Sequence, residues 1–260
     1  MHANGIFHVH TYRCGHAQMI SESVYIEKAA ALGSPEIWFS DHAPFPGNPF
    51  GNRMRDEELN EYLDTLISLR DKYKNTIRVR IGLEIEYVQS YDEGGYYKAL
   101  KNDKRIEFLL LGQHMAEVPD VPGMYTFSWD KERLASQEYA ILGNAEAAGI
   151  KTGYFDAVAH PDRIYRRCKE WDSAMAETAH SIIEEARIRD IPLEINMHSI
   201  KCKHHYWKQF WDIAKEAGVQ TVIGLDAHSI SEIERRYARQ KQWMSHTQES
   251  SGNRLRVCTV

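Results

Sequence analysis

The sequence predicts an α/β protein in which parallel strands alternate with helices and the sheet closes into a barrel. Seven short apolar segments have the character of strands, and most are followed by a loop and a helix. This strict alternation produces a parallel sheet with right-handed crossovers. The chain has 260 residues, a length at which such barrels form one domain.

The predicted strands are short. They cover residues 6–10, 36–40, 78–84, 108–114, 155–160, 193–196 and 221–226. The fourth begins with a continuous apolar run, Phe108–Leu111, which suits a strand buried on both faces. Prolines follow the second and fifth strands and force the chain out of regular structure there.

Capping residues and apolar periodicity define the predicted helices. They cover residues 21–32, 56–73, 91–102, 131–148, 172–189 and 205–217, and a last helix opens at a capping-box pattern that begins at Ser231. Ser21 and Asp130 are suitable N-caps, and Gly218 follows a helix end. Leucines recur at three- and four-residue steps along 56–73, which gives that helix one apolar face.

No linker or low-complexity segment divides the chain. We therefore assign residues 1–245 to one barrel domain, and we expect the polar, aperiodic residues 246–260 to form a tail that is either disordered or peripheral. The four cysteines are scattered without a C-x-x-C spacing, and we expect them to remain thiols. They are Cys14, Cys168, Cys202 and Cys258.

Composition and charge narrow the classes of function. The chain is 43% hydrophobic and 27% charged, as in ordinary globular proteins. Its net charge of −5 argues against a nucleic-acid partner but leaves an anionic small-molecule substrate open. Because it has no leader-like N-terminus and no membrane-length apolar run, we expect a cytoplasmic protein with no membrane partner. The oligomeric state is not predicted.

Three histidines, His8, His10 and His16, fall within nine residues near the N-terminus. On a strand, His8 and His10 point to the same side, and imidazole is the commonest metal ligand in proteins. These residues predict part of a metal site, with ordinary surface histidines as the alternative. Cys14 could add a ligand, but a small residue in a tight loop beside Gly15 is the simpler interpretation.

Residues that can bind metals gather at the C-terminal ends of six predicted strands, the face that carries the active site in such barrels. Seven of the 13 histidines and two acids lie there: His8, His10, His16, His42, Glu84, His114, His160, Asp226 and His228. Each alone has a simpler interpretation, as a structural histidine, an ion-pair partner or a helix cap. Together they predict a metal centre.

Nine such groups are too many for one zinc ion, which takes about four ligands. They suit two or three divalent ions that share a carboxylate, and Glu84 is the best bridging candidate. Mixed His, Asp and Glu coordination fits Zn, Fe or Mn better than Mg or Ca. Such ions hold a hydroxide nucleophile near neutral pH and stabilise a phosphoryl group. Phosphate-ester hydrolysis is the natural reaction, with amide or lactone hydrolysis as the alternative.

Six motifs point to a known family. They are His8-Val-His-Thr, Cys14-Gly-His-Ala, Phe39-Ser-Asp-His-Ala-Pro-Phe-Pro46, Gly82-Leu-Glu84, His160-Pro-Asp162 and Asp226-Ala-His228. The set, spread over about residues 5–230, resembles the PHP (polymerase and histidinol phosphatase) superfamily. Cys-Gly-His-Ala together with Ser-Asp-His-Ala-Pro is similar to its histidinol-phosphate phosphatase branch.

The resemblance implies a distorted TIM-like (β/α)7 barrel with a trinuclear centre. By analogy the three ligand sets are His8, His10, Glu84 and Asp226; Glu84, His114 and His160; and His16, His42 and His228. Two segments depart from the branch, Gly112-Gln-His-Met115 and the run from Glu194 to Ser199. Both follow strands on the expected substrate side, so the departures bear on the substrate more than on the chemistry.

Arginine suits a phosphate because it binds two oxygens at once. The substrate-binding candidates are Arg163, Arg53, Arg13 and His198, with Arg163 preferred. Arg55 has a simpler interpretation as a solvated helix start. The predicted catalytic residues are Glu84, Asp226 and Arg163. The general acid stays open among a metal-bound water, Asp41 and Asp162.

The sequence thus predicts a cytoplasmic, metal-dependent phosphomonoesterase that acts on a small phosphorylated metabolite. The resemblance implies histidinol phosphate as substrate and a role in histidine biosynthesis. The alternatives are a PHP phosphoesterase for a nucleotide or oligonucleotide 3′-end, phosphotyrosine or a sugar phosphate, and a non-catalytic metal-binding barrel.

Overall fold

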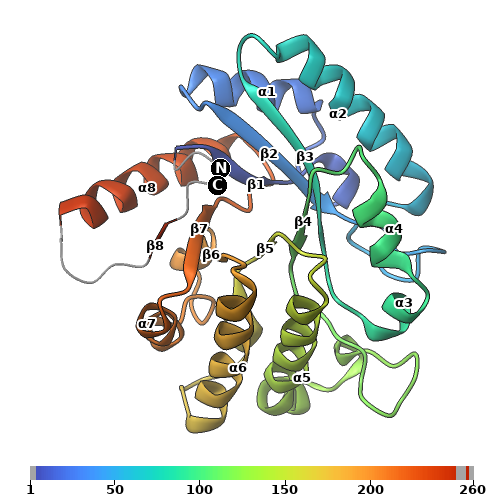
Figure 1. Ribbon diagram of the computed structural model, residues 1–260, viewed down its shortest axis with the longest axis vertical. Coiled ribbons are helices and arrows are strands. Elements are labelled where there is room, and N and C mark those ends of the chain that lie inside the picture. Colours follow the sequence, from blue (N-terminus) through green and yellow to red (C-terminus); the bar gives the residue numbers. More distant parts are fainter. Residues whose placement is uncertain (1–3, 250–255, 258–260) are drawn as a thin grey trace.

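The computed structural model describes residues 4–249 and 256–257. All its strands are parallel and follow one another in the sheet in chain order. They are β1 (Ile6–Val9), β2 (Glu36–His42), β3 (Arg78–Ile85), β4 (Phe108–Leu111), β5 (Ala157–Val158), β6 (Leu193–Asn196), β7 (Gln220–Gly224) and β8 (Arg256–Val257). Figure 1 shows the helices arranged around these strands.

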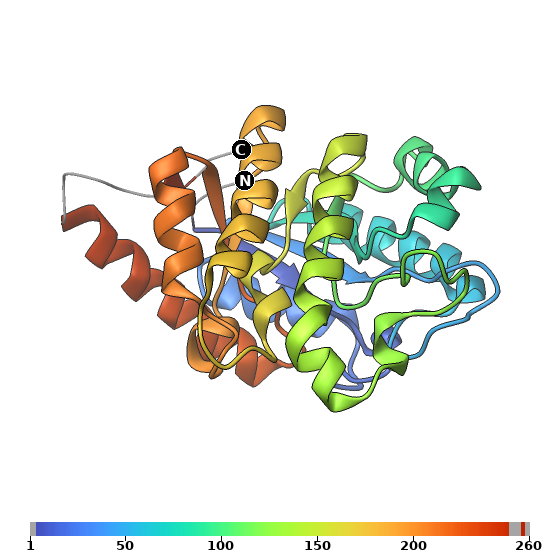
Figure 2. The same ribbon diagram turned by 90° about the horizontal axis from the view of Figure 1, so that it is seen from below.

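The longer helices connect successive strands, as the alternation predicts. The helices are α1 (Glu22–Ala31), α2 (Leu59–Tyr73), α3 (Gln89–Glu93), α4 (Tyr96–Asn102), α5 (Lys131–Thr152), α6 (Ser173–Arg189), α7 (Lys208–Ala217) and α8 (Ile230–Glu249). Figure 2 shows α5, α6 and α7 side by side on one flank. Over residues 4–249 and 256–257, no helix is both long enough and apolar enough to cross a bilayer.

The barrel closes between β1 and the segment that follows β7. Val9 and Ala227 form a parallel bridge, and the backbone N of His10 donates to the carbonyl of Ala227 at 2.9 Å. β8 pairs instead with the start of β7, where Gln220 lies opposite Arg256. Strands β1 to β7 therefore form a nearly closed barrel, which confirms the predicted fold class.

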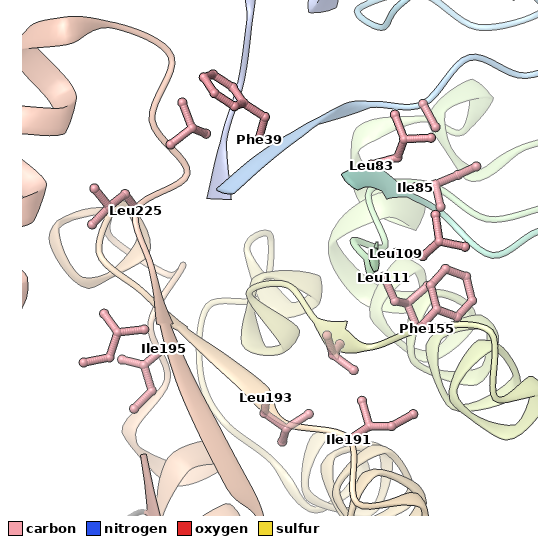
Figure 3. Close-up of a cluster of buried hydrophobic side chains, with 14 of the residues drawn as sticks. Phe39, Leu83, Ile85, Leu109, Leu111, Phe155, Ile191, Leu193, Ile195 and Leu225 are labelled. Carbon is pink, nitrogen blue, oxygen red and sulfur yellow. The ribbon is translucent and has the colours of Figure 1, made fainter. Parts of the chain in front are cut away.

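Apolar side chains fill two layers because successive residues of a strand face opposite sides. Leu109 and Leu111 face the helices, and Figure 3 shows them in a cluster with Phe39, Leu83, Ile85 and Leu193. Leu110 belongs instead to a smaller cluster of strand residues inside the barrel. Glu84 lies opposite Leu110 across β3 and β4, so its side chain also faces the interior.

Several elements differ from the predicted boundaries. The segment predicted as one helix over 91–102 forms α3 and α4, because Gly95 takes a left-handed φ of 77° between them. The regular part of the fifth strand is only two residues long, because the chain turns at His160 before Pro161.

The C-terminal boundary also differs. α8 continues past residue 245 to Glu249, since no proline or glycine interrupts the sequence between 231 and 251. It begins at Ile230, and the Ser229 hydroxyl accepts from the backbone N of Glu232, so the cap lies before the predicted Ser231. The predicted tail 246–260 contributes the end of α8 and the strand β8, and the rest of it lies outside the described residues.

Cysteine pairing agrees with the prediction where the structure describes it. Cys14, Cys168 and Cys202 are free thiols. Cys258 lies outside the described residues.

Candidate metal centre

The structure brings all nine predicted ligands together at the C-terminal ends of the strands. Five of them are almost fully buried: His8, His10, Glu84, His160 and Asp226. Three of these five have a left-handed backbone, with φ of 67° at His8, 30° at His160 and 50° at Asp226. Residues other than glycine rarely adopt this conformation, and backbone strain of this kind gathers at functional sites.

Glu84 lies at the middle of the centre, and its two oxygens face different histidines. Oε2 is 3.3 Å from His8 Nε2, 3.4 Å from His10 Nε2 and 3.2 Å from His42 Nδ1. Oε1 is 3.0 Å from His160 Nε2 and 3.7 Å from His114 Nε2. One carboxylate therefore contacts two groups of ligands, the arrangement that a bridging residue requires.

The remaining ligands surround this carboxylate. Asp226 Oδ1 lies 3.5 Å from His10 Nε2 and 3.6 Å from His228 Nδ1. His16, His42 and His228 offer ring nitrogens that lie within 4.8 Å of one another. Of the three, His16 is exposed, so this part of the centre is open to solvent.

Buried polar atoms without partners show that the residues fit metal ions. Within the described residues, these atoms have no hydrogen-bond partner: both oxygens of Glu84, His10 Nδ1, His160 Nε2 and His228 Nε2. Native proteins rarely leave buried polar atoms without a hydrogen-bond partner, so several such atoms gathered in one place require an explanation. Divalent ions among these nitrogens and oxygens supply one.

The charges of the centre also suit cations. Burial raises the pKa of Glu84, but His8, His42 and His114 override it, so the net pKa lies well below its usual range. Burial lowers the pKa of His42 and also that of His228, the latter to about 2. The carboxylate is thus ionised and these two imidazoles are neutral, which are the forms that bind metals. Burial also lowers the pKa of His8 and His10, but neighbouring carboxylates outweigh it and raise the net pKa, to about 9 at His10, so these two rings give up a proton when they bind an ion.

A cavity of about 650 Å³ opens over the centre. Its lining includes five of the predicted ligands and three arginines: His16, His42, His114, Asp226, His228, Arg53, Arg163 and Arg236. Phe50 and Phe127 also line it. The cavity therefore combines ligands, cations and aromatic rings within reach of one small molecule.

Comparison with known proteins identifies the family. The sequence profile described as PHP domain matches residues 7–198 of this chain. The chain belongs to the PHP domain family. Most of the predicted ligands lie within the matched part of this PHP domain, whereas Asp226 and His228 lie beyond it.

Two curated relatives are similar to this PHP domain. A histidinol-phosphatase of Bacillus subtilis is 28% identical over 92 residues, or 33% of this chain and 34% of that protein. The match thus spans about a third of that relative's length. A Deinococcus radiodurans protein named "Probable histidinol-phosphatase" is 24% identical over 242 residues, which cover 89% of this chain and 88% of that protein.

Solved structures share the fold of this PHP domain. A candidate histidinol phosphatase, hisK, of Listeria monocytogenes superposes with a TM-score of 0.72 at 18% identity and covers 90% of this chain and 98% of its own. A histidinol phosphate phosphatase of Lactococcus lactis, complexed with zinc, L-histidinol and phosphate, has a TM-score of 0.66 at 18% identity, with 90% and 92% coverage.

Three of the four predicted substrate-binding residues line the cavity. Arg163 lines the cavity, with Nη1 3.6 Å from Asp226 Oδ2, and His198 lines it as well. Arg53 also lines it, although its guanidinium is paired with Glu86 at 3.0 and 3.1 Å.

Arg13, the remaining predicted substrate residue, does not line this cavity. Its guanidinium is buried in ion pairs with Glu22 and Glu61. The sequence places Arg13 beside the histidine motif, but the short helix at Tyr12–Cys14 directs the side chain toward these acids. This placement argues against a substrate-binding role. Arg55 is exposed at a helix start beside Glu57, as its simpler interpretation predicts.

The two carboxylates considered as general acids both have partners within the protein, and Asp41 Oδ1 lies 3.5 Å from Nδ1 of the ligand His10. Asp41 is fully buried and accepts from the backbone N of Thr11 at 3.2 Å and of His42 at 3.0 Å. Asp162 accepts from the backbone N of Trp207 at 2.9 Å and from Trp211 Nε1 at 2.8 Å. Neither lines the cavity.

Sequence reasoning missed the carboxylates that hold the histidine rings. Glu194 Oε1 lies 2.7 Å from His8 Nδ1, and Glu86 Oε1 lies 3.1 Å from His114 Nδ1. A carboxylate on the second ring nitrogen fixes the orientation of a metal-binding histidine. A signal was present, because Glu86 follows Glu84 by two residues and Glu194 is an acid between two apolar residues of a strand, Leu193 and Ile195.

Proposed function

We propose that this protein is a metal-dependent phosphomonoesterase that hydrolyses histidinol phosphate to histidinol and phosphate. The observation that carries the proposal is the buried Glu84 carboxylate, unpartnered among the described residues and surrounded by histidines, beneath a cavity lined by arginines. The relatives named as histidinol phosphatases, and the L-histidinol and phosphate in the Lactococcus lactis structure, support this substrate.

The nine ligand residues would hold two or three divalent ions, and Zn, Fe or Mn suits their mixture of nitrogen and oxygen ligands. Such ions, when bound, supply an activated water and stabilise the charge of the phosphoryl group. We propose that the ligands divide among the ions as the resemblance implies. Glu84 would serve two ions, one together with His8, His10 and Asp226 and the other together with His114 and His160. The remaining ligands, His16, His42 and His228, would hold a third ion.

The protein's own residues would hold the substrate in place. Arg163 is the one predicted phosphate ligand whose guanidinium both lines the cavity and lies beside the ligand Asp226, so we assign the phosphate oxygens to it. Glu194 keeps His8 oriented and also accepts from the backbone N of His160 at 2.9 Å. These contacts fix two ligands before substrate binds, which lowers the cost of reaching the reactive geometry.

The cavity wall suits the organic part of histidinol phosphate. Phe50 and Phe127 contribute aromatic rings to the lining, with the Arg53 guanidinium 5.6 Å from the centre of the Phe50 ring, and aromatic rings favour contact with a planar imidazole. Glu232 also lines the cavity; its carboxylate is paired with Arg236 and accepts from the backbone N of His228 at 2.7 Å, and an ammonium group would have to share it. A small phosphorylated metabolite with a ring and an amine therefore fits better than a bare sugar phosphate.

A substrate panel tests this proposal. We would measure kcat/KM of the zinc- and manganese-loaded protein with histidinol phosphate, phosphotyrosine, a sugar phosphate and a 3′-phosphorylated oligonucleotide. The expected result is the highest value for histidinol phosphate, with activity lost in Glu84→Gln. A preference for another ester would overturn the substrate, and a loaded protein inactive toward every ester would overturn the phosphatase itself.

A further inference from the structure

A second group of metal-binding side chains lies in the loop between β6 and α7. His198, Cys202 and His205 each offer a ligand atom, and these atoms lie within 4.8 Å of one another. We call them the His-Cys-His cluster. None of the nine ligands of the Glu84 centre belongs to it.

We propose that the His-Cys-His cluster is an additional metal site that takes a thiophilic ion such as Zn²⁺. Cys202 Sγ lies 3.5 Å from His198 Nε2. Zinc bonds of about 2.3 Å to sulfur and 2.0–2.1 Å to nitrogen, at a tetrahedral angle, separate the two ligand atoms by about 3.5 Å. The observed separation, which is that of a hydrogen bond in the absence of an ion, equals the separation of two ligands of one tetrahedral ion.

His205 provides a second, independent observation. Its Nδ1 atom is buried and has no hydrogen-bond partner among the described residues. Burial lowers the pKa of His205 to about 4, and the positive charge of Arg163 acts in the same direction. The ring is therefore neutral at physiological pH and has a lone pair free for a metal.

The loop holds the cluster in place by backbone hydrogen bonds. Asn196 Oδ1 accepts from the backbone N of His198 at 2.9 Å and of Ser199 at 3.0 Å. Farther along, the backbone N of Cys202 donates to the carbonyl of Ser199 at 2.9 Å, and that of His205 to the carbonyl of Cys202 at 3.1 Å. These successive turns bring residues 198, 202 and 205 together before an ion binds.

The charges around the cluster determine which ion it can hold. Arg236 lies 2.7 Å from His198 Nδ1, and Arg163 is also close by. These two arginines repel a metal cation, so binding of the ion requires Cys202 to lose its proton to the solvent and to serve as a negatively charged thiolate ligand. Thiolate with two imidazoles selects zinc or copper over Mg or Ca.

Binding of the ion also requires a change at Arg236. At present Arg236 donates to His198 Nδ1, which leaves the ring proton on Nε2. Coordination through Nε2 moves this proton to Nδ1, so Nδ1 can no longer accept a hydrogen bond from Arg236. The Arg236 side chain must then turn away from His198. It keeps its other partners, which are the Glu232 carboxylate and the carbonyls of Leu225 and Asp226. The proposal therefore gives His198 to a metal ion, in place of the substrate role predicted from the sequence.

Metal stoichiometry of the full-length protein tests the proposal. We would dialyse wild type, Cys202→Ser, His205→Gln and the control Cys168→Ser against buffered zinc and measure bound zinc per chain. The expected result is a loss of one equivalent in the first two variants and none in the control, with unchanged hydrolysis of p-nitrophenyl phosphate at saturating metal. Equal zinc content in all four proteins would overturn the proposal.

A measurement on the wild-type protein tests the proposal even if the variants fail to fold. Zinc should slow the alkylation of Cys202 by iodoacetamide, read by peptide mass spectrometry, because a coordinated thiolate is protected. Cys168 serves as the internal reference, and its alkylation should not respond to zinc. A Cys202 alkylation rate that zinc leaves unchanged would also overturn the proposal.

Discussion

Replacing Gly112 by alanine should displace the carboxylate at the middle of the metal centre. A Cβ atom at residue 112 would lie 2.7 Å from Cδ and 2.8 Å from Cγ of Glu84. The shorter distance is 0.7 Å less than the 3.4 Å at which ordinary contact begins, and Oε1 would lie closer still. The backbone of Glu84 is part of β3 and is fixed by pairing with β4, so the side-chain carboxylate must move within the centre.

The size of the effect follows from this displacement. A shift approaching 1 Å in a catalytic group costs roughly 100-fold in rate, which corresponds to about 2.7 kcal/mol of transition-state stabilisation. We therefore expect kcat/KM of Gly112→Ala for p-nitrophenyl phosphate to fall by about 100-fold, with a loss of bound metal.

The matched control is Gly94→Ala, because a Cβ there would meet only ordinary contacts, at 3.4 and 3.8 Å. Metal content, steady-state kinetics and the unfolding temperature should be measured on both variants. Wild-type metal content and kinetics in folded Gly112→Ala would refute the reasoning, since they would mean that Glu84 can move without consequence.

Three further substitutions test other parts of the structure. Glu194→Gln should weaken metal binding by about 10- to 100-fold in a chelator competition, because His8 loses its carboxylate partner at 2.7 Å; unchanged affinity would contradict this. Arg163→Ala should lower kcat/KM by roughly 10- to 100-fold while metal content stays constant, and a loss of metal would instead indicate a structural role. Glu146 is buried and unpartnered among the described residues, and burial raises the pKa of its carboxyl group in the folded state. The folded protein therefore keeps this proton at pH values where the unfolded chain has lost it. The free energy of unfolding should fall as the pH rises from about 4.5, the unfolded pKa, toward the folded pKa. Urea unfolding of Glu146→Gln should lack this loss, about 1.4 kcal/mol for each unit of pKa shift, and equal pH dependence in both proteins would count against it.

Much of the fold could be predicted because local signals agreed with one another. The apolar run at Phe108–Leu111 and the N-caps at Ser21 and Asp130 predicted elements that the structure contains. The boundaries failed where tertiary contacts decide them. Strand β5 keeps only two paired residues, and β8 forms by pairing with β7, which no local pattern reveals.

The candidate site divides in the same way. Ligand types could be predicted because parallel strands bring their C-terminal ends to one face, so residues far apart in sequence meet there. The direction of a side chain could not be predicted. Arg13 and Arg163 are both arginines near histidine motifs, yet the first pairs with Glu22 and the second lines the cavity.

By itself the sequence determined the alternation of strands and helices, the ligand residues at the strand ends and the family that they indicate. These features follow from residue type and spacing, because capping residues, apolar periodicity and the order of the strands along the chain are all properties of the sequence. Only the tertiary structure decided that Glu84 faces two groups of histidines, that Glu194 holds His8, and that His198, Cys202 and His205 meet in one loop. Such contacts depend on distances between segments, which are set when the barrel closes and the core packs.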